Sequence, residues 1–528
     1  MAKKFDKVTS LESLEAKLAE MREAQAIYSK FTQEQVDEIC KQAAMAADKA
    51  RIPLAKMANA ETGMGVVEDK VIKNNYAAEH IFNYFRHMKT CGVISEDKAF
   101  GTKRIAEPVG IVGAVTPTTN PTSTAIFKIL ICLKTRNAIL LSPHPTAKKC
   151  TIEAARIMRE AAEKAGLPEN IICWMDESSI EMTQMMMREV NLIMATGGAG
   201  MVKAAYSSGT PAIGVGPGNC NVVIDETADL RMAVESIIHS KTFDNGMICA
   251  AEQHVTVLDS IYDQVKKKFQ ESRCYFLTKE EAAKVGEVFF NSATHGVKAT
   301  AVGRPATKLA EMAGIKVPAD TKVLIAETDD TSHDNAWANE KLCPVLGMYR
   351  AKDFPQAMDI CYKLVTEGGA GHSAAMYVNP NEREKINAFG LRMKAGRVII
   401  NMPTTFGGLG DLYNFDTPPS LTLGPGTFGG SSFMGQTNVM QLLNIKTVAE
   451  RRENMLWLRL PEKVYFKKGC APVALKELRD EYNCKRAFII TDATLFELGM
   501  CDSAIKQLEE MGIATSAFYN IRVDPQIQ

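Results

Sequence analysis

The sequence of 528 residues lacks a long apolar run and lacks the features of a secretory leader. No stretch approaches the about 18 consecutive apolar residues that a membrane-spanning helix needs. The N-terminal segment 1–21 is charged, has apolar residues at helical spacing and contains no small-residue cleavage site. These absences argue against a membrane partner and predict a cytoplasmic protein.

The sequence also lacks an excess of charge of either sign and lacks closely paired cysteines. Lys+Arg and Asp+Glu both total 62, so the net charge gives no reason to expect nucleic-acid binding. The 13 cysteines are odd in number and scattered without a CxxC pair, which favours reduced thiols over a disulfide framework. With 46% hydrophobic and 23% charged residues, the composition is that of an ordinary globular protein of about two to four domains.

Helices and strands are predicted to alternate through most of the chain. Apolar spacing predicts helices over residues 8–90, and one of them begins after Thr32, with Gln35 completing a capping box. From Lys103 the pattern changes to short β-prone segments separated by helices, which is typical of an α/β fold with parallel sheets. Ligands of such sheets bind at the carboxyl ends of strands. Strands are predicted at residues 104–115, 138–142, 171–174, 190–195, 221–225, 254–257, 322–325, 371–377 and 397–401.

The composition of the chain changes at residue 403 and again at residue 436. Residues 403–435 are rich in Gly, Pro and Phe, and so long an irregular stretch is usually functional or wraps a neighbour. Residues 436–461 carry many charges and are predicted to form a helical connector between domains. Beyond them, strands over 463–468, 486–492 and 514–519 and helices over 473–482 and 503–511 predict the beginning of a further α/β unit, with 486–492 a buried strand.

Cys249 is the candidate nucleophile. It stands in KTFDNGMICAAEQHVTV (residues 241–257), between a predicted helix over 230–243 and a predicted strand over 254–257. A loop at this place can direct a thiol into a cleft, and a thiolate attacks carbonyl carbons well. The alternative is a buried structural cysteine, because free cysteines are usually packing residues.

A glycine-rich turn is the candidate cofactor-binding motif. Thr196-Gly197-Gly198-Ala199-Gly200 lies between a predicted strand and a predicted helix over 201–207. Glycines in this context let a phosphate or ribose approach backbone N–H groups and the helix N-terminus. A tight packing turn is the alternative. The second glycine run, residues 214–219, contains Pro217 and leads into a strand, so it is predicted to line a site rather than to hold a phosphate.

Five stretches resemble one known family: TPTTNPTSTAIFK (116–128), ATGGAGMVKAAYSSG (195–209), KTFDNGMICAAEQ (241–253), EKLCPVLGMYRAKDF (340–354) and GGLGDLYNF (407–415). Residues 8 to about 450 resemble the CoA-acylating acetaldehyde dehydrogenase half of the bifunctional aldehyde–alcohol dehydrogenases. Residues 452–528 resemble the opening of the fused iron-dependent alcohol dehydrogenase half. Its glycine-rich cofactor loop and iron-ligating histidines are not in this sequence, so neither iron nor alcohol dehydrogenase activity is expected.

The resemblance implies an aldehyde-dehydrogenase-like α/β fold with a Rossmann-type cofactor-binding domain. Residues 1–245 would form the NAD-binding domain with its N-terminal helices, and residues 246–435 the catalytic and oligomerisation region. Residues 436–461 would be a linker, followed by an incomplete alcohol dehydrogenase domain over 462–528. Full-length members form helical filaments, so a homo-oligomer is expected.

The resemblance also implies the site residues. Cys249 would be the nucleophile, Asn120 an oxyanion donor together with the Cys249 N–H, and His372 an active-site histidine that assists the CoA thiol or contacts the cofactor. Their alternatives are a turn-stabilising Asn and a packed core His. The implied NAD-binding residues are Pro117, Thr118, Thr196, Gly197, Gly198, Gly216 and Glu340, with Glu340 on the nicotinamide-side ribose or, alternatively, on the surface. No metal site is expected.

The implied reaction is the reversible reduction of acetyl-CoA to acetaldehyde with NADH through a cysteine thioester. Hydrolytic relatives carry a general-base Glu where this sequence has Gly214. Without that base, attack of water on the thioester should be slow, which favours acyl transfer to CoA. A hydrolytic aldehyde dehydrogenase and a filament or assembly module with little activity are the alternatives.

Overall fold

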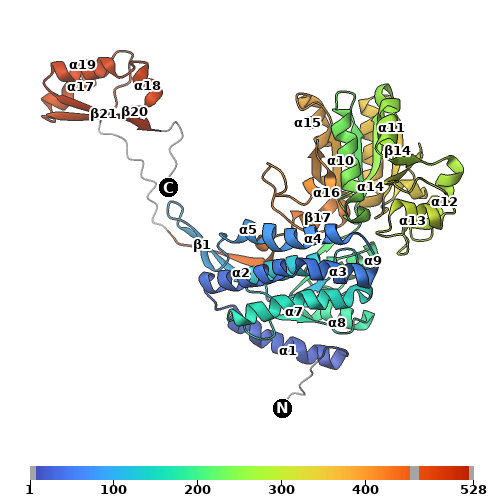
Figure 1. Ribbon diagram of the computed structural model, residues 1–528. Coiled ribbons are helices and arrows are strands. Elements are labelled where there is room, and N and C mark those ends of the chain that lie inside the picture. The colour runs from blue at the N-terminus through green and yellow to red at the C-terminus, as the bar shows by residue number, and fades with distance from the viewer. Residues whose placement is uncertain (1–6, 452–462, 522–528) are drawn as a thin grey trace. The chain divides into compact units, whose positions relative to one another are not determined.

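The computed structural model describes residues 7–451 and 463–521, which divide after Glu450 into two units (Figure 1). No helix in these ranges has the length and apolar character that crossing a bilayer requires. The first unit contains the candidate site, and the second is described separately below.

The N-terminal helices predicted within residues 8–90 are confirmed. They are α1 (Leu11–Tyr28), α2 (Gln33–Lys49), α3 (Arg51–Thr62), α4 (Val67–Asn75), the π-helix η1 (Tyr76–His80) and α5 (Ile81–Phe85). The capping box at Thr32 is present, since its hydroxyl accepts from the Gln35 N–H and the Gln35 side chain accepts from the Thr32 N–H. Buried apolar residues of α1 and α2 pack into the same core as the first sheet.

The first sheet is parallel and has five strands in the order β5-β4-β3-β6-β7. The strands are β3 (Ile111–Val115), β4 (Ala138–Ser142), β5 (Ile172–Trp174), β6 (Leu192–Thr196) and β7 (Ala212–Val215), and the helices between them are α6 (Pro121–Lys134), α7 (Lys148–Lys164), α8 (Ile180–Glu189) and α9 (Ala199–Tyr206). The chain runs outward from β3 to β5 and then returns to β6 on the other side of β3. Ligands of open α/β sheets bind where the strand order reverses in this way, so the crevice beyond β3 and β6 is the expected binding site.

The second sheet is also parallel and has seven strands in the order β10-β13-β14-β9-β8-β15-β16. These are β8 (Cys220–Ile224), β9 (Glu252–Leu258), β10 (Cys274–Phe276), β13 (Val323–Glu327), β14 (Val345–Ala351), β15 (Gly371–Tyr377) and β16 (Ala395–Ile400). Helices α10 (Leu230–Thr242), α11 (Tyr262–Glu271), α12 (Lys279–Phe289), α13 (Ala306–Met312), α14 (Phe354–Gly369) and α15 (Arg383–Arg392) accompany them. Because β8 pairs with β9 and β15, this α/β region begins before the boundary predicted at residue 245.

The predicted helical connector over 436–461 is wrong in its described part. Residues Leu443–Ala449 form strand β19, which pairs antiparallel with β2 (Thr102–Pro108), and β2 pairs with β1 (Gly92–Asp97). The charges that suggested a helix lie on this strand, where Lys446 pairs with Glu107 across the ladder. The rest of the predicted linker, residues 452–462, lies outside the described residues. The stretch 403–435 is largely irregular, as predicted, with only short elements such as α16 (Thr404–Gly407) and β17 (Leu423–Pro425).

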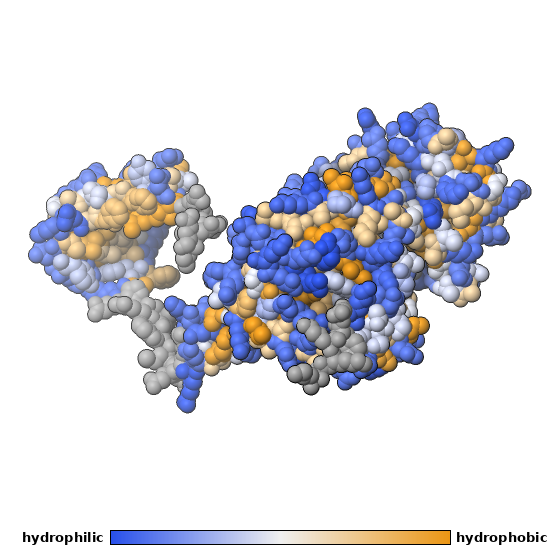
Figure 2. Space-filling view, turned by 60° about the horizontal axis from the view of Figure 1, so that its bottom comes forward, coloured by the Kyte–Doolittle hydropathy of each residue, from blue (hydrophilic) through white to orange (hydrophobic). Residues whose placement is uncertain are grey.

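The second unit contains α17 (Ala471–Asp480), β20 (Arg486–Asp492), α18 (Ala493–Glu497), α19 (Asp502–Glu510) and β21 (Ala514–Ile521). The strand predicted over 463–468 does not form. The prediction of a buried strand over 486–492 is also wrong, since Phe488 and Ile490 are each 62% exposed. The parallel sheet of β20 and β21 is only two strands wide, and alternate side chains on β20 face outward. Apolar side chains are therefore visible on the surface of this unit (Figure 2).

Candidate active site

One cavity of about 850 Å³ lies where the two sheets of the first unit face each other. The first sheet contributes the segments after β3 and β6, and the second sheet contributes the segments before β8, β9 and β14. Since β14, β9 and β8 are neighbours, their amino ends bring Glu340, Cys249 and Gly216 to the same edge. Nine predicted site residues line the cavity: Cys249, Asn120, Pro117, Thr118, Thr196, Gly197, Gly198, Gly216 and Glu340.

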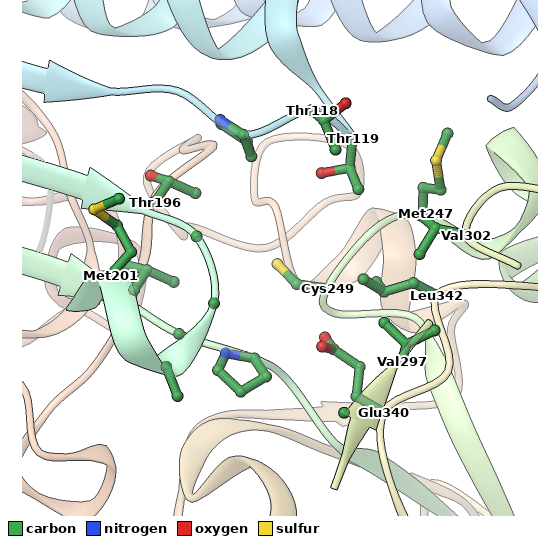
Figure 3. A pocket seen from close by; sticks show the side chains of 18 of the residues that line it. Thr118, Thr119, Thr196, Met201, Met247, Cys249, Val297, Val302, Glu340 and Leu342 are labelled. Atoms are coloured by element: carbon green, nitrogen blue, oxygen red, sulfur yellow. The ribbon is translucent and has the colours of Figure 1, made fainter. Parts of the chain in front are cut away.

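Cys249 occupies the turn between the 3₁₀ helix η3 (Phe243–Gly246) and β9. Its thiol points into the middle of the cavity, with Thr196 and Met201 on one side and Leu342 on the other (Figure 3). Burial, together with the Glu340 carboxylate, raises the pKa of the Cys249 thiol to about 12, although the nearby cations lower it. The thiol is therefore protonated near neutral pH in the free protein, and its activation depends on the surrounding charges.

The backbone before Cys249 is left-handed at three consecutive residues, with φ of 48° at Asp244, 53° at Asn245 and 74° at Gly246. Asp, Asn and Gly are the residues that tolerate this conformation best. The turn is held from outside, because Asp244 accepts from the Val66 N–H at 2.8 Å and donates its own N–H to Asp69 at 2.7 Å. The sequence Asp244-Asn245-Gly246 is typical of such a turn.

Asn120 lines the cavity from the turn between β3 and α6. Its Oδ1 accepts from Lys73 Nζ at 2.6 Å, and its Nδ2 donates to Thr119 Oγ1 at 3.1 Å. Asn120 is the N-cap residue of α6, but its side chain makes no capping hydrogen bond there. The side chain therefore does not cap α6, but its bond to Thr119 lies within the turn, so the turn-stabilising alternative stays open and the oxyanion role stays a prediction.

Glu340 reaches the cavity from the loop before β14, opposite Thr118 (Figure 3). Its Oε1 accepts from the Gly218 N–H at 2.8 Å. Burial raises the pKa of this carboxyl to about 7, although the hydrogen bond from Gly218 and the cation of Lys241 act in the opposite direction. Glu340 is therefore not a surface glutamate, which was the alternative.

The glycine-rich turn has the open space that a dinucleotide requires. Gly198 is the N-cap of α9, and a Cβ on Gly198, Gly200 or Gly216 would meet no atom within 4 Å. Buried hydroxyls of Thr116 and Thr196 also line the cavity and have no hydrogen-bond partner within residues 7–451. Exposed helix N–H groups, open glycines and unpaired hydroxyls fit phosphate and ribose groups.

His372 is the one predicted site residue that the structure does not bring to the cavity. It is buried at the start of β15, with Nδ1 3.1 Å from Ser373 Oγ. Its ring lies beside Gly218, because a Cβ on Gly218 would come within 3.1 Å of it. Burial and the Arg397 guanidinium lower the pKa of His372 to about 3, so the ring is neutral. These contacts match the alternative of a packed histidine, and a catalytic role stays a prediction.

Gly214 lies in β7 and does not line the cavity. A Cβ at this position would come within 2.7 Å of the Tyr206 ring and 2.8 Å of Val202. The Tyr206 hydroxyl accepts from the Gly214 N–H at 2.9 Å. Side chains of α9 therefore occupy the space next to Gly214, which leaves no room there for the carboxylate of a general base.

Sequence reasoning missed an apolar arm of the cavity. Met64, Met247 and Val302 form a buried cluster, and Val297 and Leu342 pack against it. Figure 3 shows Met247, Val302, Leu342 and Val297 on the side of Cys249 opposite Thr196. They come from four distant segments without a shared motif, so only the folded chain brings them together.

Sequence reasoning also missed two buried cations near Cys249, Lys73 and Arg397. Arg397 donates to the main-chain oxygens of His372, Leu423 and Gly424, and no carboxylate pairs with it in the described part of the chain. Both cations lower the pKa of the Cys249 thiol against the effect of burial. Their positive charges therefore oppose the effect of the Glu340 carboxylate on the thiol pKa.

Comparisons with known proteins identify the family of the chain. The model of the aldehyde dehydrogenase family matches residues 7–410. The bifunctional aldehyde-alcohol dehydrogenase AdhE of Escherichia coli (strain K12) is 51% identical over 523 residues, which are 98% of this chain and 58% of that protein. The chain therefore spans little more than half the length of that relative.

Two solved structures are similar in fold. An acetylating aldehyde dehydrogenase from Geobacillus thermoglucosidasius superposes with a TM-score of 0.81 at 43% identity, covering 86% of this chain and 98% of that one. A propionaldehyde dehydrogenase from Rhodopseudomonas palustris with bound propionyl-CoA has a TM-score of 0.74 at 26% identity, covering 84% and 95%. The cavity, the cysteine at its centre and these similarities lead to one conclusion: the chain belongs to the aldehyde dehydrogenase family.

Proposed function

We propose that this chain is a CoA-acylating acetaldehyde dehydrogenase that reversibly reduces acetyl-CoA to acetaldehyde with NADH. The observation that carries the proposal is the position of Cys249. Its thiol lies at the centre of one cavity, between the open glycine turn and the apolar arm. A nucleophile there can hold an acyl group between a nucleotide site and an apolar subsite.

Acylation begins with attack of the Cys249 thiolate on the thioester carbonyl of acetyl-CoA. A carbon–sulfur bond to Cys249 forms, and the carbonyl oxygen becomes an oxyanion that needs hydrogen-bond donors. The Cys249 N–H and Asn120 Nδ2 are the proposed donors. Collapse of the oxyanion breaks the bond to the CoA sulfur, which leaves as a thiolate and takes up a proton.

The cofactor is held by residues of the first sheet and by Glu340. Thr196, Gly197, Gly198 and Gly216 surround the space for the phosphates and ribose, with Pro117 and Thr118 on the facing turn. Glu340 can accept hydrogen bonds from ribose hydroxyls with the oxygen that Gly218 does not use. A nicotinamide bound there would supply the hydride to the carbonyl carbon of the Cys249 thioester. The carbon–sulfur bond to Cys249 then breaks, which releases the aldehyde and leaves the Cys249 thiolate.

Acyl transfer to CoA is favoured over release to water because no base occupies position 214. Two carboxylates line the cavity within the described ranges, Glu340 and Glu367, and Glu340 is already bonded to the Gly218 N–H. General-base catalysis contributes about 10²–10⁴-fold, so its absence leaves the thioester to a second thiol.

Self-association into an oligomer, or into a filament as in full-length members, and a cytoplasmic location remain predictions.

The test is oxidation of NADH with acetyl-CoA, comparing the wild type with Cys249→Ser and with Cys91→Ser as the matched control. Cys91 is a partly buried thiol outside the cavity. We expect Cys249→Ser to be slower by at least about 1,000-fold, because removing a nucleophile removes the whole covalent route. Wild-type protein without CoA-dependent turnover, or unchanged turnover in Cys249→Ser, would overturn the proposal. Acetate released as fast as aldehyde would favour the hydrolytic alternative.

A further inference from the structure

Lys73 is a buried cation that contacts the candidate oxyanion donor. It lies on α4 and is only 4% exposed. Its Nζ donates to Asn120 Oδ1 at 2.6 Å and also pairs with the Asp244 carboxylate. Nothing in the sequence links Lys73 to residue 120 or to the Cys249 loop, and the reaction described above gives it no role apart from its effect on the pKa of the Cys249 thiol.

The contact with Lys73 decides which end of the Asn120 amide faces the ammonium group. An ammonium group donates hydrogen bonds and cannot accept them, so Asn120 must present its oxygen to Lys73. Its Nδ2 is then left on the side of Thr119, 3.1 Å from the hydroxyl. A half-turn of the amide would set its N–H groups against the ammonium, which is repulsive, and would leave its oxygen, which cannot donate, on the side of Thr119.

Asp244 holds Lys73 in this place. Its carboxylate is fully buried and accepts from Lys70 Nζ at 3.1 Å, from the Val66 N–H at 2.8 Å and from Lys73. Removing one partner from such a buried charge cluster leaves the others uncompensated, so the cluster resists rearrangement. Helix α4 is thereby tied both to the turn that carries Asn120 and to the left-handed turn before Cys249.

We propose that Lys73 is a positioning residue that orients the Asn120 amide so that Nδ2 donates to the oxyanion formed when Cys249 is acylated. The inference rests on the proposed function, because that oxyanion arises in the proposed reaction. Lys70 provides the matched control, since it is equally buried and pairs with the same Asp244 carboxylate, but it makes no hydrogen bond to Asn120.

The experiment measures the pre-steady-state release of p-nitrophenolate from p-nitrophenyl acetate. This ester acylates a thiol through an oxyanion but requires neither CoA nor a nicotinamide. We expect Lys73→Met to lower the acylation rate constant by roughly 10- to 100-fold with little change in ester binding, which is less than the about 100- to 1,000-fold that removal of an oxyanion donor costs, because Asn120 is still present. Lys70→Met should lose no more than about threefold. Equal losses in the two variants would overturn the inference.

A double variant tests whether Lys73 acts through Asn120. In the Asn120→Ala background, Lys73→Met should slow acylation much less than it does in the wild type, because coupled residues are not additive, and the loss that remains comes from the effect of Lys73 on the Cys249 pKa. Losses that multiply would contradict the inference. If Lys73→Met does not fold, Asn120→Asp tests the donor that Lys73 is proposed to orient. It keeps a partner for Lys73 but offers only acceptors, so a stable protein with acylation lowered about 100-fold is expected, and full acylation would contradict the inference.

The ester separates this inference from the proposed function. A wild type that is acylated by the ester but does not turn over acetyl-CoA would end the proposed function, and the comparison of Lys73→Met with Lys70→Met would still decide the role of Lys73. A wild-type Cys249 that the ester does not acylate would overturn the inference itself.

Discussion

At the scale of single residues, the reactivity of Cys249 depends on the charges around its thiol. Burial raises its pKa to about 12, the Glu340 carboxylate acts in the same direction, and Arg397 and Lys73 act against both. A thiolate rather than a thiol is the nucleophile, so these charges set the reactive fraction at a given pH. The balance can be measured without any substrate.

Glu340→Gln should make Cys249 more reactive. Because the pKa of Glu340 is about 7, its carboxylate is charged at pH 8, where it raises the thiol pKa, and it is largely protonated at pH 5.5. We expect alkylation of Cys249 by iodoacetamide at pH 8 to be faster by about 2- to 10-fold in Glu340→Gln, with a smaller difference at pH 5.5. Glu367→Gln, an exposed carboxylate on the cavity rim, is the control. An unchanged or slower rate in Glu340→Gln at pH 8 would contradict this reading.

At the scale of secondary-structure elements, the sequence was informative wherever the signal was local. The alternation of strands and helices, the turn at Thr196–Gly200 and the loop position of Cys249 could all be predicted, because apolar period and glycine placement are local. The Asn120–Lys73 contact and the apolar arm could not be predicted, because they join segments far apart in the chain. The error at 443–449 has a physical reason as well, since a charged strand that pairs along one edge resembles a solvated helix in composition.

The N-terminus of α9 should hold the cofactor. Gly198→Val places a side chain in open space next to the unpaired Thr196 hydroxyl, so the fold should tolerate it while the nucleotide should not. We expect the KM for NADH to rise at least about 10-fold with an unchanged melting temperature. The control is Gly390→Val, at an exposed helical glycine with equally open surroundings. An unchanged KM for NADH in Gly198→Val would show that the nucleotide binds elsewhere.

The apolar arm should limit the acyl chain. Leu342→Ala removes a side chain that points toward Cys249 and leaves room for more methylene groups (Figure 3). We expect the ratio of kcat/KM for butyryl-CoA to that for acetyl-CoA to rise at least about 10-fold, since a few methylene groups in an apolar pocket have effects of this size. Met312→Ala, at an exposed methionine of α13, should leave the ratio unchanged. A ratio in Leu342→Ala equal to that of the wild type would show that the acyl group binds outside this arm.

At the scale of the whole molecule, the first unit contains every residue that lines the cavity. It ends after β19 rather than at residue 435, because residues 443–449 complete a sheet with β2. The second unit packs as a separate body with its own two-stranded sheet. The chemistry should therefore depend on the first unit alone.

Two truncated chains test this division. A chain of residues 1–450 should keep acetyl-CoA-dependent NADH oxidation within about twofold of the whole chain, as expected for a unit with its own core. A chain of residues 1–435 should melt at a lower temperature and aggregate, because the loss of β19 exposes an edge of β2. Equal stability of the two truncated chains, measured by thermal denaturation and light scattering, would contradict this assignment of β19.

The most direct test of the whole account is the mass of the Cys249 peptide after the protein has been mixed with acetyl-CoA alone. We predict one added acetyl group on Cys249, which persists in buffer and is lost within one turnover when NADH is added, with acetaldehyde as the product. An acetyl group on another residue, no acetyl group, or loss to acetate in buffer as fast as loss with NADH would contradict the account.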